Sequence, residues 1–185
     1  MRTFIAVDCN NKEKIYLIQQ DLLIYLSDFR SILKPVKFEN LHFTLFFLGE
    51  TDDNQVDLIR NKLNEIELKQ FEISYRKLGV FPSIKYPKII WIGIDTLSEQ
   101  KLSSLYELVL SKMKQIGFRA DKHFTPHLTI FRVKNINTNM ERYLNKYKND
   151  ANIDFSDIID KIQFKKSELF STGPIYSNIL TIFPK

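Results

Sequence analysis

The chain has 185 residues, of which 44% are apolar and 26% charged, with a formal net charge of +5. A chain of this length can bury a core of its own, so we expect one soluble globular domain that needs no disulfide or structural metal. The single cysteine, Cys9, excludes a disulfide framework and a cysteine-based zinc site. The first eight residues fit neither a secretory signal nor a membrane span, so we expect a cytoplasmic protein. The small excess of basic residues favours a polyanionic partner.

Hydrophobic periodicity predicts strands and helices in alternation. Short apolar runs that stop at Gly, Pro or polar residues indicate strands, whereas apolar residues repeating every three or four positions indicate helices. Two prolines within residues 82–88 mark an internal junction. In chain order the predicted elements are a strand at 3–7, a helix at 15–29, a strand at 41–48, a helix at 56–66, strands at 71–81 and 89–94, a helix at 98–117, a strand at 127–133, a helix at 140–147, and strands at 158–169 and 175–183.

The second half of the chain repeats the motifs of the first half in the same order. FIAVD at residues 4–8 matches WIGID at 91–95, HFTLF at 42–46 matches HLTIF at 127–131, and residues 73–78 resemble 162–167. We therefore predict a single domain, 1–185, of two lobes: repeat 1 at 1–82, repeat 2 at 89–172, and a final strand at 175–183. The expected fold is α+β, with two pseudo-symmetric β-α-β-α-β lobes whose two antiparallel-type sheets face a common groove and whose helices lie outside.

Two of the three histidines occupy the same position in this repeat. Because side chains alternate along a strand, His42 and Thr44 share one face, and so do His127 and Thr129. A displacement at phosphorus needs a base on the attacking oxygen and an acid on the leaving oxygen. Histidine suits both roles, and threonine hydroxyls can donate hydrogen bonds to the non-bridging oxygens. The pattern predicts acid–base chemistry at phosphorus with no metal and no cofactor.

Other residues near these motifs have more than one interpretation. Alternation puts Phe46 and Phe131 on the face of the histidines, where they could stack on a base, although core packing is the favoured interpretation. His123 lies outside the repeat and is interpreted as a solvated loop residue. Lys165 and Lys166 are interpreted as exposed strand positions.

The two motifs, HFTL at 42–45 and HLTI at 127–130, resemble the HxTx signatures of the two-histidine (2H) phosphoesterase superfamily. Within it, the flanking segments resemble the RNA 2′,3′-cyclic phosphodiesterases of bacteria and archaea, the LigT-like or 2′-5′ RNA ligase family. The similar segments are RTFIAVD at 2–8, ENLH at 39–42, FLGE at 47–50, LGVFP at 78–82, FTPH at 124–127, RV at 132–133, SEL at 167–169 and GPIY at 173–176.

The resemblance implies a LigT-like fold and hydrolysis of a 2′,3′-cyclic phosphate at an RNA end to a 2′-phosphate. It implies that His42 is the proton donor to the departing 3′ oxygen and His127 the proton acceptor, with Thr44 and Thr129 binding phosphate. Arg132 matches an arginine that is usual after the second motif and could pair with phosphate, although strand alternation puts it on the face opposite His127. Members of the family also join tRNA halves through a 2′-5′ linkage.

Two alternatives stay open from the sequence. The first is a non-catalytic module that binds single-stranded RNA through a basic, aromatic groove. The second keeps the chemistry but acts on small cyclic nucleotides or 2′-5′ oligoadenylates. The expected partner is RNA with a cyclic phosphate end, tRNA fragments included, and not a membrane. A monomer is expected, because no exposed heptad or apolar stripe calls for a dimer.

Overall fold

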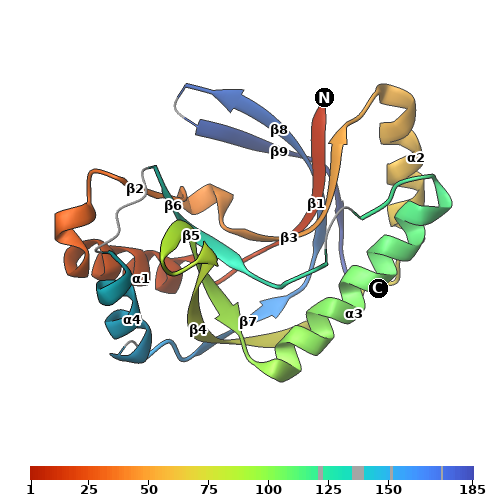
Figure 1. Ribbon diagram of the computed structural model, residues 1–185. Helices are drawn as coiled ribbons and strands as arrows, with labels where there is room; N and C mark the ends of the chain where they lie inside the picture. The colour runs from red at the N-terminus through yellow and green to blue at the C-terminus, as the bar shows by residue number, and fades with distance from the viewer. Residues whose placement is uncertain (121–122, 135–139, 151, 172) are drawn as a thin grey trace.

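Nine strands in the described part of the chain form one sheet, and four α-helices pack against it (Figure 1). The computed structural model describes residues 1–120, 123–134, 140–150, 152–171 and 173–185. The strands are β1 (Arg2–Asp8), β2 (Leu33–Pro35), β3 (His42–Glu50), β4 (Phe71–Ser83), β5 (Tyr86–Ile94), β6 (Leu128–Val133), β7 (Phe155–Ile159), β8 (Ile162–Phe170) and β9 (Gly173–Ile182). The helices are α1 (Lys12–Tyr25), α2 (Asp53–Asn64), α3 (Thr96–Gln115) and α4 (Met140–Asp150), with 3₁₀ turns η1 (Ser27–Phe29) and η2 (Phe38–Asn40).

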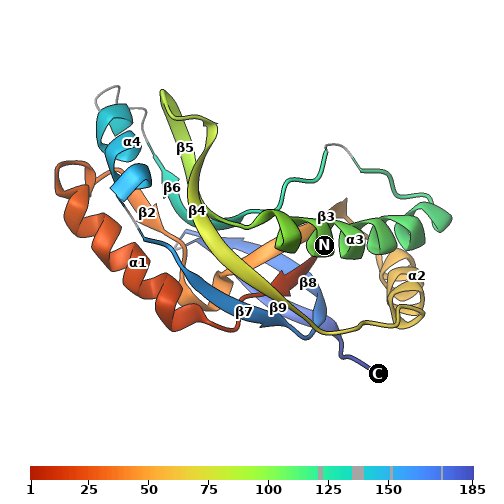
Figure 2. The ribbon, with the colours of Figure 1, turned by 90° about the horizontal axis from the view of Figure 1, so that it is seen from below.

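The sheet consists of two arms that meet at β3 and β6. Its strand order is β7-β4-β5-β6-β3-β1-β8-β9, with β2 also paired to β6. One residue pair, Phe43 with Leu128, joins the arms. Figures 1 and 2 show α2 beside the first arm (β3, β1, β8, β9) and α1 and α4 beside the second (β6, β5, β4, β7), while α3 contacts β4 of the second arm and β3 of the first. The α+β class and the two lobes are confirmed, and the two expected sheets are continuous through this central pair.

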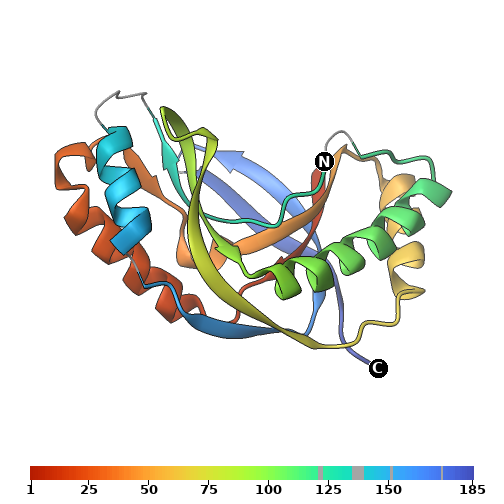
Figure 3. The same cartoon turned by 60° about the horizontal axis from the view of Figure 1, so that its bottom comes forward.

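The arms exchange strands between the two sequence repeats. Strand β4 comes from the first repeat but pairs with β5, and β8 comes from the second repeat but pairs with β1. Figure 3 shows β4 running from the α2 end of the molecule to the α4 end. Neither predicted repeat therefore builds an arm alone, and the expected junction at 82–88 is the tight connection between two paired strands.

Polar side chains fix where helices α2 and α3 begin. Asp52 accepts a hydrogen bond from the backbone N–H of Gln55, whose side chain accepts one from the backbone N–H of Asp52. The Asp95 carboxylate accepts from the backbone N–H of Ser98 at 2.7 Å. Apolar residues of both helices are buried in the single core that they share with the sheet.

A carboxylate from a distant strand holds the start of α1. Asp157 on β7 is buried and accepts hydrogen bonds from the backbone N–H groups of Asn10 and Asn11, at 2.8 and 3.0 Å. The Cys9 thiol and the Tyr75 hydroxyl also donate to it. Burial raises the pKa of Cys9 to about 12, so the thiol stays protonated. This network ties the second repeat to the first helix.

Three local features differ from the expected elements. The single strand predicted at 158–169 is two strands, β7 and β8, because the polar residues Asp160 and Lys161 form a connection between them. Helix α1 ends at Tyr25 and is followed by η1, and the short strand β2 was not predicted. None of the helices within the described ranges is long and apolar enough to cross a membrane.

Candidate active site

Each HxTx strand contains a β-bulge directly after its threonine. Between β1 and β3, Ile5 lies opposite Phe46 and Ala6 opposite Thr44, which leaves Leu45 without a partner residue. Between β5 and β6 the register skips Ile130 in the same way. A bulge adds one residue to a strand, so the alternation of faces restarts after it.

The bulges reverse the faces that the sequence predicted for the following residues. Phe46 and Phe131 are only 3% and 0% exposed and pack in the core, so the core-packing interpretation of these two rings is confirmed and the possible base-stacking role is wrong. The next residues, Phe47 and Arg132, lie on the face of the histidines instead. Phe47 is 74% exposed, and the charge of Arg132 lowers the pKa of both His42 and His127. The expectation that Arg132 lies opposite His127 is therefore wrong for the same reason.

The two HxTx pairs meet at the central strand pair. Phe43 lies opposite Leu128, and continuing this antiparallel register by one residue puts Thr129 beside His42 and Thr44 beside His127. His42 and His127 are then diagonal neighbours across the strand pair, and the backbone positions of such neighbours are roughly 7 to 8 Å apart. Both imidazoles are half-buried. The four side chains thus occupy one patch around the pseudo-two-fold axis, on what we call the site face of the sheet.

Both imidazole rings are oriented by the same hydrogen bond. Nδ1 of His42 lies 2.7 Å from the carbonyl oxygen of Asn40, and Nδ1 of His127 lies 2.7 Å from that of Thr125. A carbonyl can only accept, so each Nδ1 carries the hydrogen and each Nε2 is left to accept or, when protonated, to donate. Nε2 of His42 lies 3.1 Å from Oγ1 of Thr44.

Aromatic rings pack around His42. The Phe4 ring lies 5.1 Å from the imidazole, and the edge of the Tyr176 ring meets it at 5.4 Å. Phe4 and Tyr176 also contact each other, at 4.9 Å. These rings restrict the imidazole to one orientation and shield it from water on one side.

His127 lies in a similar environment. The Phe81 and Trp91 rings lie 5.0 and 6.2 Å from the imidazole. Trp91 covers Gly79, where an added Cβ would come within 2.1 Å of the indole, so the close approach of this ring requires glycine. The four aromatic residues around the histidines were missed by sequence reasoning. The aromatic residues at the start of the matched FIAVD and WIGID blocks were the available signal.

The site lowers the pKa of both histidines. Burial lowers the pKa of His42 to about 4; the Asn40 carbonyl and Asp8 oppose this, and the charges of Lys165 and Arg132 add to it. Burial also lowers the pKa of His127, opposed by the Thr125 carbonyl and reinforced by Arg132. Both imidazoles are therefore neutral at pH 7 in the free protein.

One buried ion pair distinguishes the two histidines. Asp8 lies opposite His42 between β1 and β3, and its carboxylate is 3.0 Å from Nζ of Lys165. Lys165 is only 5% exposed, so its interpretation as an exposed strand position is wrong. The position beside His127 that corresponds to Asp8 is Gly93, one residue beyond the Ile92–Leu128 pair. The carboxylate thus faces only one of the two rings.

The remaining candidate ligands do not complete a metal site. Within the residues that the structure describes, no three His, Cys, Asp or Glu side chains gather closely enough to hold a metal ion. His123 is exposed in the loop before β6, and Cys9 is buried in the core. The groups on the site face, two imidazoles, two hydroxyls and one guanidinium, can transfer protons and bind the oxygens of an anion.

The chain is similar to known proteins over most of its length. The family model described as LigT like Phosphoesterase matches residues 11–91 and 94–176. A protein of Archaeoglobus fulgidus named RNA 2′,3′-cyclic phosphodiesterase is 36% identical over 182 residues, covering 97% of this chain and 98% of its own. A protein of the same name from Aquifex aeolicus is 38% identical over 157 residues, covering 81% of each chain.

Solved structures share the fold. A protein of Thermus thermophilus superposes with a TM-score of 0.77 at 23% identity, covering 99% of this chain and 97% of its own. Escherichia coli LigT in complex with 3′-AMP gives a TM-score of 0.74 at 19% identity with the same coverage. The chain therefore belongs to the LigT-like family of two-histidine phosphoesterases.

Proposed function

We propose that this protein hydrolyses 2′,3′-cyclic phosphate ends of RNA to 2′-phosphates, with His42 and His127 as the acid and base. The observation that carries this proposal is the duplicated imidazole: each ring is held through Nδ1 by the carbonyl two residues before it, His42 as the first residue of β3 and His127 directly before β6. Relatives that share most of the chain are named RNA 2′,3′-cyclic phosphodiesterase, which supports this substrate.

In this mechanism one imidazole removes a proton from water and the other donates a proton to the leaving oxygen. The water oxygen forms a bond to phosphorus as the bond to the ribose 3′ oxygen breaks. We assign His42 as the donor and His127 as the acceptor, the order that the family resemblance implies; burial lowers the pKa of His42, and Asp8 beside it opposes this by favouring the imidazolium form. The reaction leaves the proton on His127, and exchange with solvent restores the starting state.

Three side chains serve the phosphoryl oxygens. The hydroxyls of Thr44 and Thr129 donate hydrogen bonds to the non-bridging oxygens, on which charge increases in the transition state. Arg132, brought to the site face by the bulge at Ile130, pairs with the same oxygens. No step uses a metal ion, and a ribose hydroxyl in place of water would give a 2′-5′ ligation.

The test is an end-group assay on an oligonucleotide that ends in a 2′,3′-cyclic phosphate, in the presence of a chelator. We expect a 2′-phosphate product, and a roughly 10² to 10⁴-fold loss of kcat in His42→Ala and in His127→Ala. The exposed His123 provides the matched control, since His123→Ala should keep the wild-type rate. A 3′-phosphate product, full inhibition by the chelator, or a near wild-type rate in either active-site variant would contradict the mechanism.

The same assay distinguishes the alternatives. An RNA-binding module without catalysis would bind single strands tightly, indifferent to the end group, and release no product. An enzyme for small cyclic nucleotides would prefer free nucleotides to long RNA. The monomeric state, the cytoplasmic location and tRNA fragments as substrates stay predictions from the sequence.

A further inference from the structure

Two basic side chains lie directly opposite each other on the site face of the sheet. Lys34 on β2 pairs with Arg132 on β6, so both side chains lie on the same face, and both are exposed. Like charges opposite each other in a sheet destabilise the strand pair. Among the described residues neither one forms an ion pair with a carboxylate. A bound anion would remove this repulsion.

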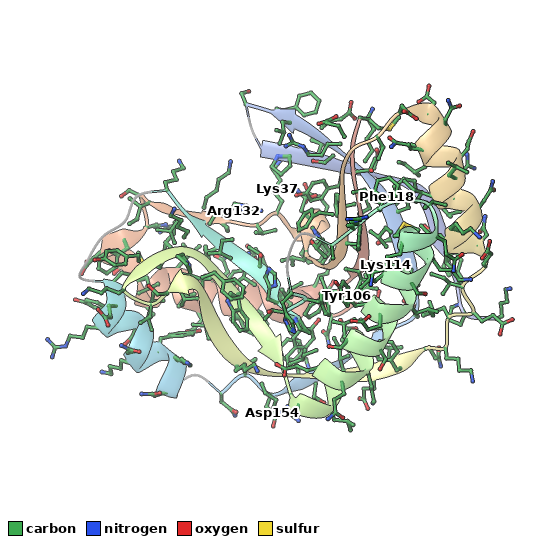
Figure 4. The ribbon with its side chains drawn as sticks, turned by 45° about the vertical axis from the view of Figure 1, so that its right-hand side comes forward. Lys37, Tyr106, Lys114, Phe118, Arg132 and Asp154 are labelled. Atoms are coloured by element: carbon green, nitrogen blue, oxygen red, sulfur yellow. The ribbon has the colours of Figure 1, made fainter. Side chains whose placement is uncertain are left out.

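The Lys34 side chain reaches from the second arm toward the first. Its Nζ lies 3.4 Å from the position that a Cβ on Gly173 would occupy, at the start of β9. The same part of β9 is fixed relative to His42, because the Asn40 side chain donates to the carbonyl of Pro174 at 3.0 Å and the Asn40 carbonyl orients the imidazole. Figure 4 shows Arg132 on the side of β6 that is turned toward the β8–β9 hairpin.

The positions of the two cations relative to the histidines separate their roles. Arg132 is close enough to lower the pKa of His42, His127 and Tyr176, so its charge acts at the centre of the site. Lys34 is one strand farther out, about 4.8 Å in the direction across the sheet. An anion at Lys34 is therefore a neighbour of the group that the histidines hold.

We propose that Lys34 binds the phosphodiester on the 5′ side of the terminal nucleotide, as a second phosphate site. This inference rests on the proposed function, since it takes the cyclic phosphate to lie between the histidines. The next anion along an RNA chain is then the phosphodiester at the 5′ oxygen of the same ribose. A nucleoside 2′,3′-cyclic phosphate lacks this group, so Lys34 makes the enzyme select RNA ends over free nucleosides.

Three substrates test the proposal: a nucleoside 2′,3′-cyclic phosphate, the same nucleoside with a 5′-phosphate, and a dinucleotide with a cyclic phosphate end. The readout is the ratio of kcat/KM for each of the last two to that for the first. We expect a ratio above one for the wild type, and a roughly three- to tenfold lower ratio for Lys34→Gln. The salt dependence of kcat/KM for the dinucleotide should weaken by about 0.7 in log–log slope. Lys69→Gln, which removes an exposed charge between α2 and β4, should change neither quantity.

The outcomes separate this proposal from the proposed function. A Lys34→Gln ratio equal to that of the wild type would overturn the second site. A uniform loss on all three substrates at an unchanged melting temperature would also overturn it, because Lys34 would then act on the cyclic phosphate itself. A wild-type protein that binds the dinucleotide but opens none of the three substrates would overturn the proposed function, and the second site with it.

Discussion

The lowered pKa values of the two histidines predict a distinctive pH dependence of catalysis. An acid–base pair is active only when one imidazole is protonated and the other neutral. With a pKa of about 4 for His42, and that of His127 also below its ordinary value, both rings are neutral in the free protein at pH 7. At that pH only about one molecule in a thousand carries a proton on His42. Because kcat/KM reports the free enzyme, it should fall about tenfold per pH unit above pH 7.

Bound substrate should move the pH dependence of kcat to higher pH. A phosphate monoanion about 4 Å from an imidazolium stabilises it by about 4 kcal/mol at an effective dielectric constant of about 20. That energy corresponds to about three pKa units, which would bring the pKa of His42 from about 4 to roughly 7 in the complex. We therefore expect kcat to stay level up to about pH 7 while kcat/KM is already falling.

The assay measures initial rates on a nucleoside 2′,3′-cyclic phosphate from pH 5 to 9 at constant ionic strength. The expected kcat/KM profile is a bell with its maximum below pH 6.5, and the kcat profile lies at higher pH. His123→Asn should reproduce the wild-type curves, because His123 lies in the exposed loop before β6. A kcat/KM that is flat between pH 5 and 8, or the same pH dependence for kcat and kcat/KM, would refute the reasoning.

Three further predictions follow from single contacts. Arg132→Gln should lower kcat/KM by roughly 10² to 10³-fold, the loss typical of removing a donor to a developing oxyanion, and Arg132→Lys should lower it by less. Arg76→Gln, which removes a charge that pairs with Asp154, is the control, and an equal rate for Arg132→Gln and this control would contradict the prediction. Gly79→Ala should displace the single tryptophan, Trp91, and lower the free energy of unfolding by about 1 to 3 kcal/mol, measured by denaturant titration followed by tryptophan fluorescence. Unchanged fluorescence and stability would contradict the packing of Trp91 over Gly79. Asp157→Ala should cost about 2 to 4 kcal/mol, because it leaves the amides at the start of α1 without their acceptor, with kcat on the cyclic phosphate unchanged at temperatures where the variant is folded.

The order of elements and the pairing of the two histidines were predictable from sequence because both depend on local patterns. His42 and Thr44 are two residues apart on one strand, so their common face follows from the strand alone. The repeat of that motif at His127 then implied a symmetric site. The structure adds that both rings use the carbonyl two residues earlier, a contact that is also local.

The faces after each threonine were not predictable because a bulge is defined by the partner strand. Nothing in HFTLF or HLTIF shows that Leu45 and Ile130 lack partner residues, and without that fact strict alternation puts Phe46, Phe131 and Arg132 on the wrong faces. The same limit applies to the aromatic residues. Tyr176 and Phe81 come to the site from β9 and β4, whose positions depend on the exchange of strands between repeats.

The asymmetry between the histidines was hidden by the sequence match itself. Aligning FIAVD with WIGID equates Asp8 with Asp95, which suggests equal surroundings for both rings. The strand ladders equate Asp8 with Gly93 instead, two residues earlier, and Asp95 serves as the N-cap of α3. Only pairing across strands reveals that Asp8 lies beside one imidazole, whereas the matching position beside the other is Gly93.

The claim on which the mechanism depends is that both imidazoles contact one phosphoryl group. Long-range ¹H–¹⁵N spectra of the histidine rings, recorded while a nucleoside 2′-phosphate is titrated into the protein, test this directly. We expect Nε2 of both His42 and His127 to shift with the same dissociation constant and both pKa values to rise, while His123 does not respond. A shift confined to one of the two rings, with the other still titrating as in the free protein, would contradict it.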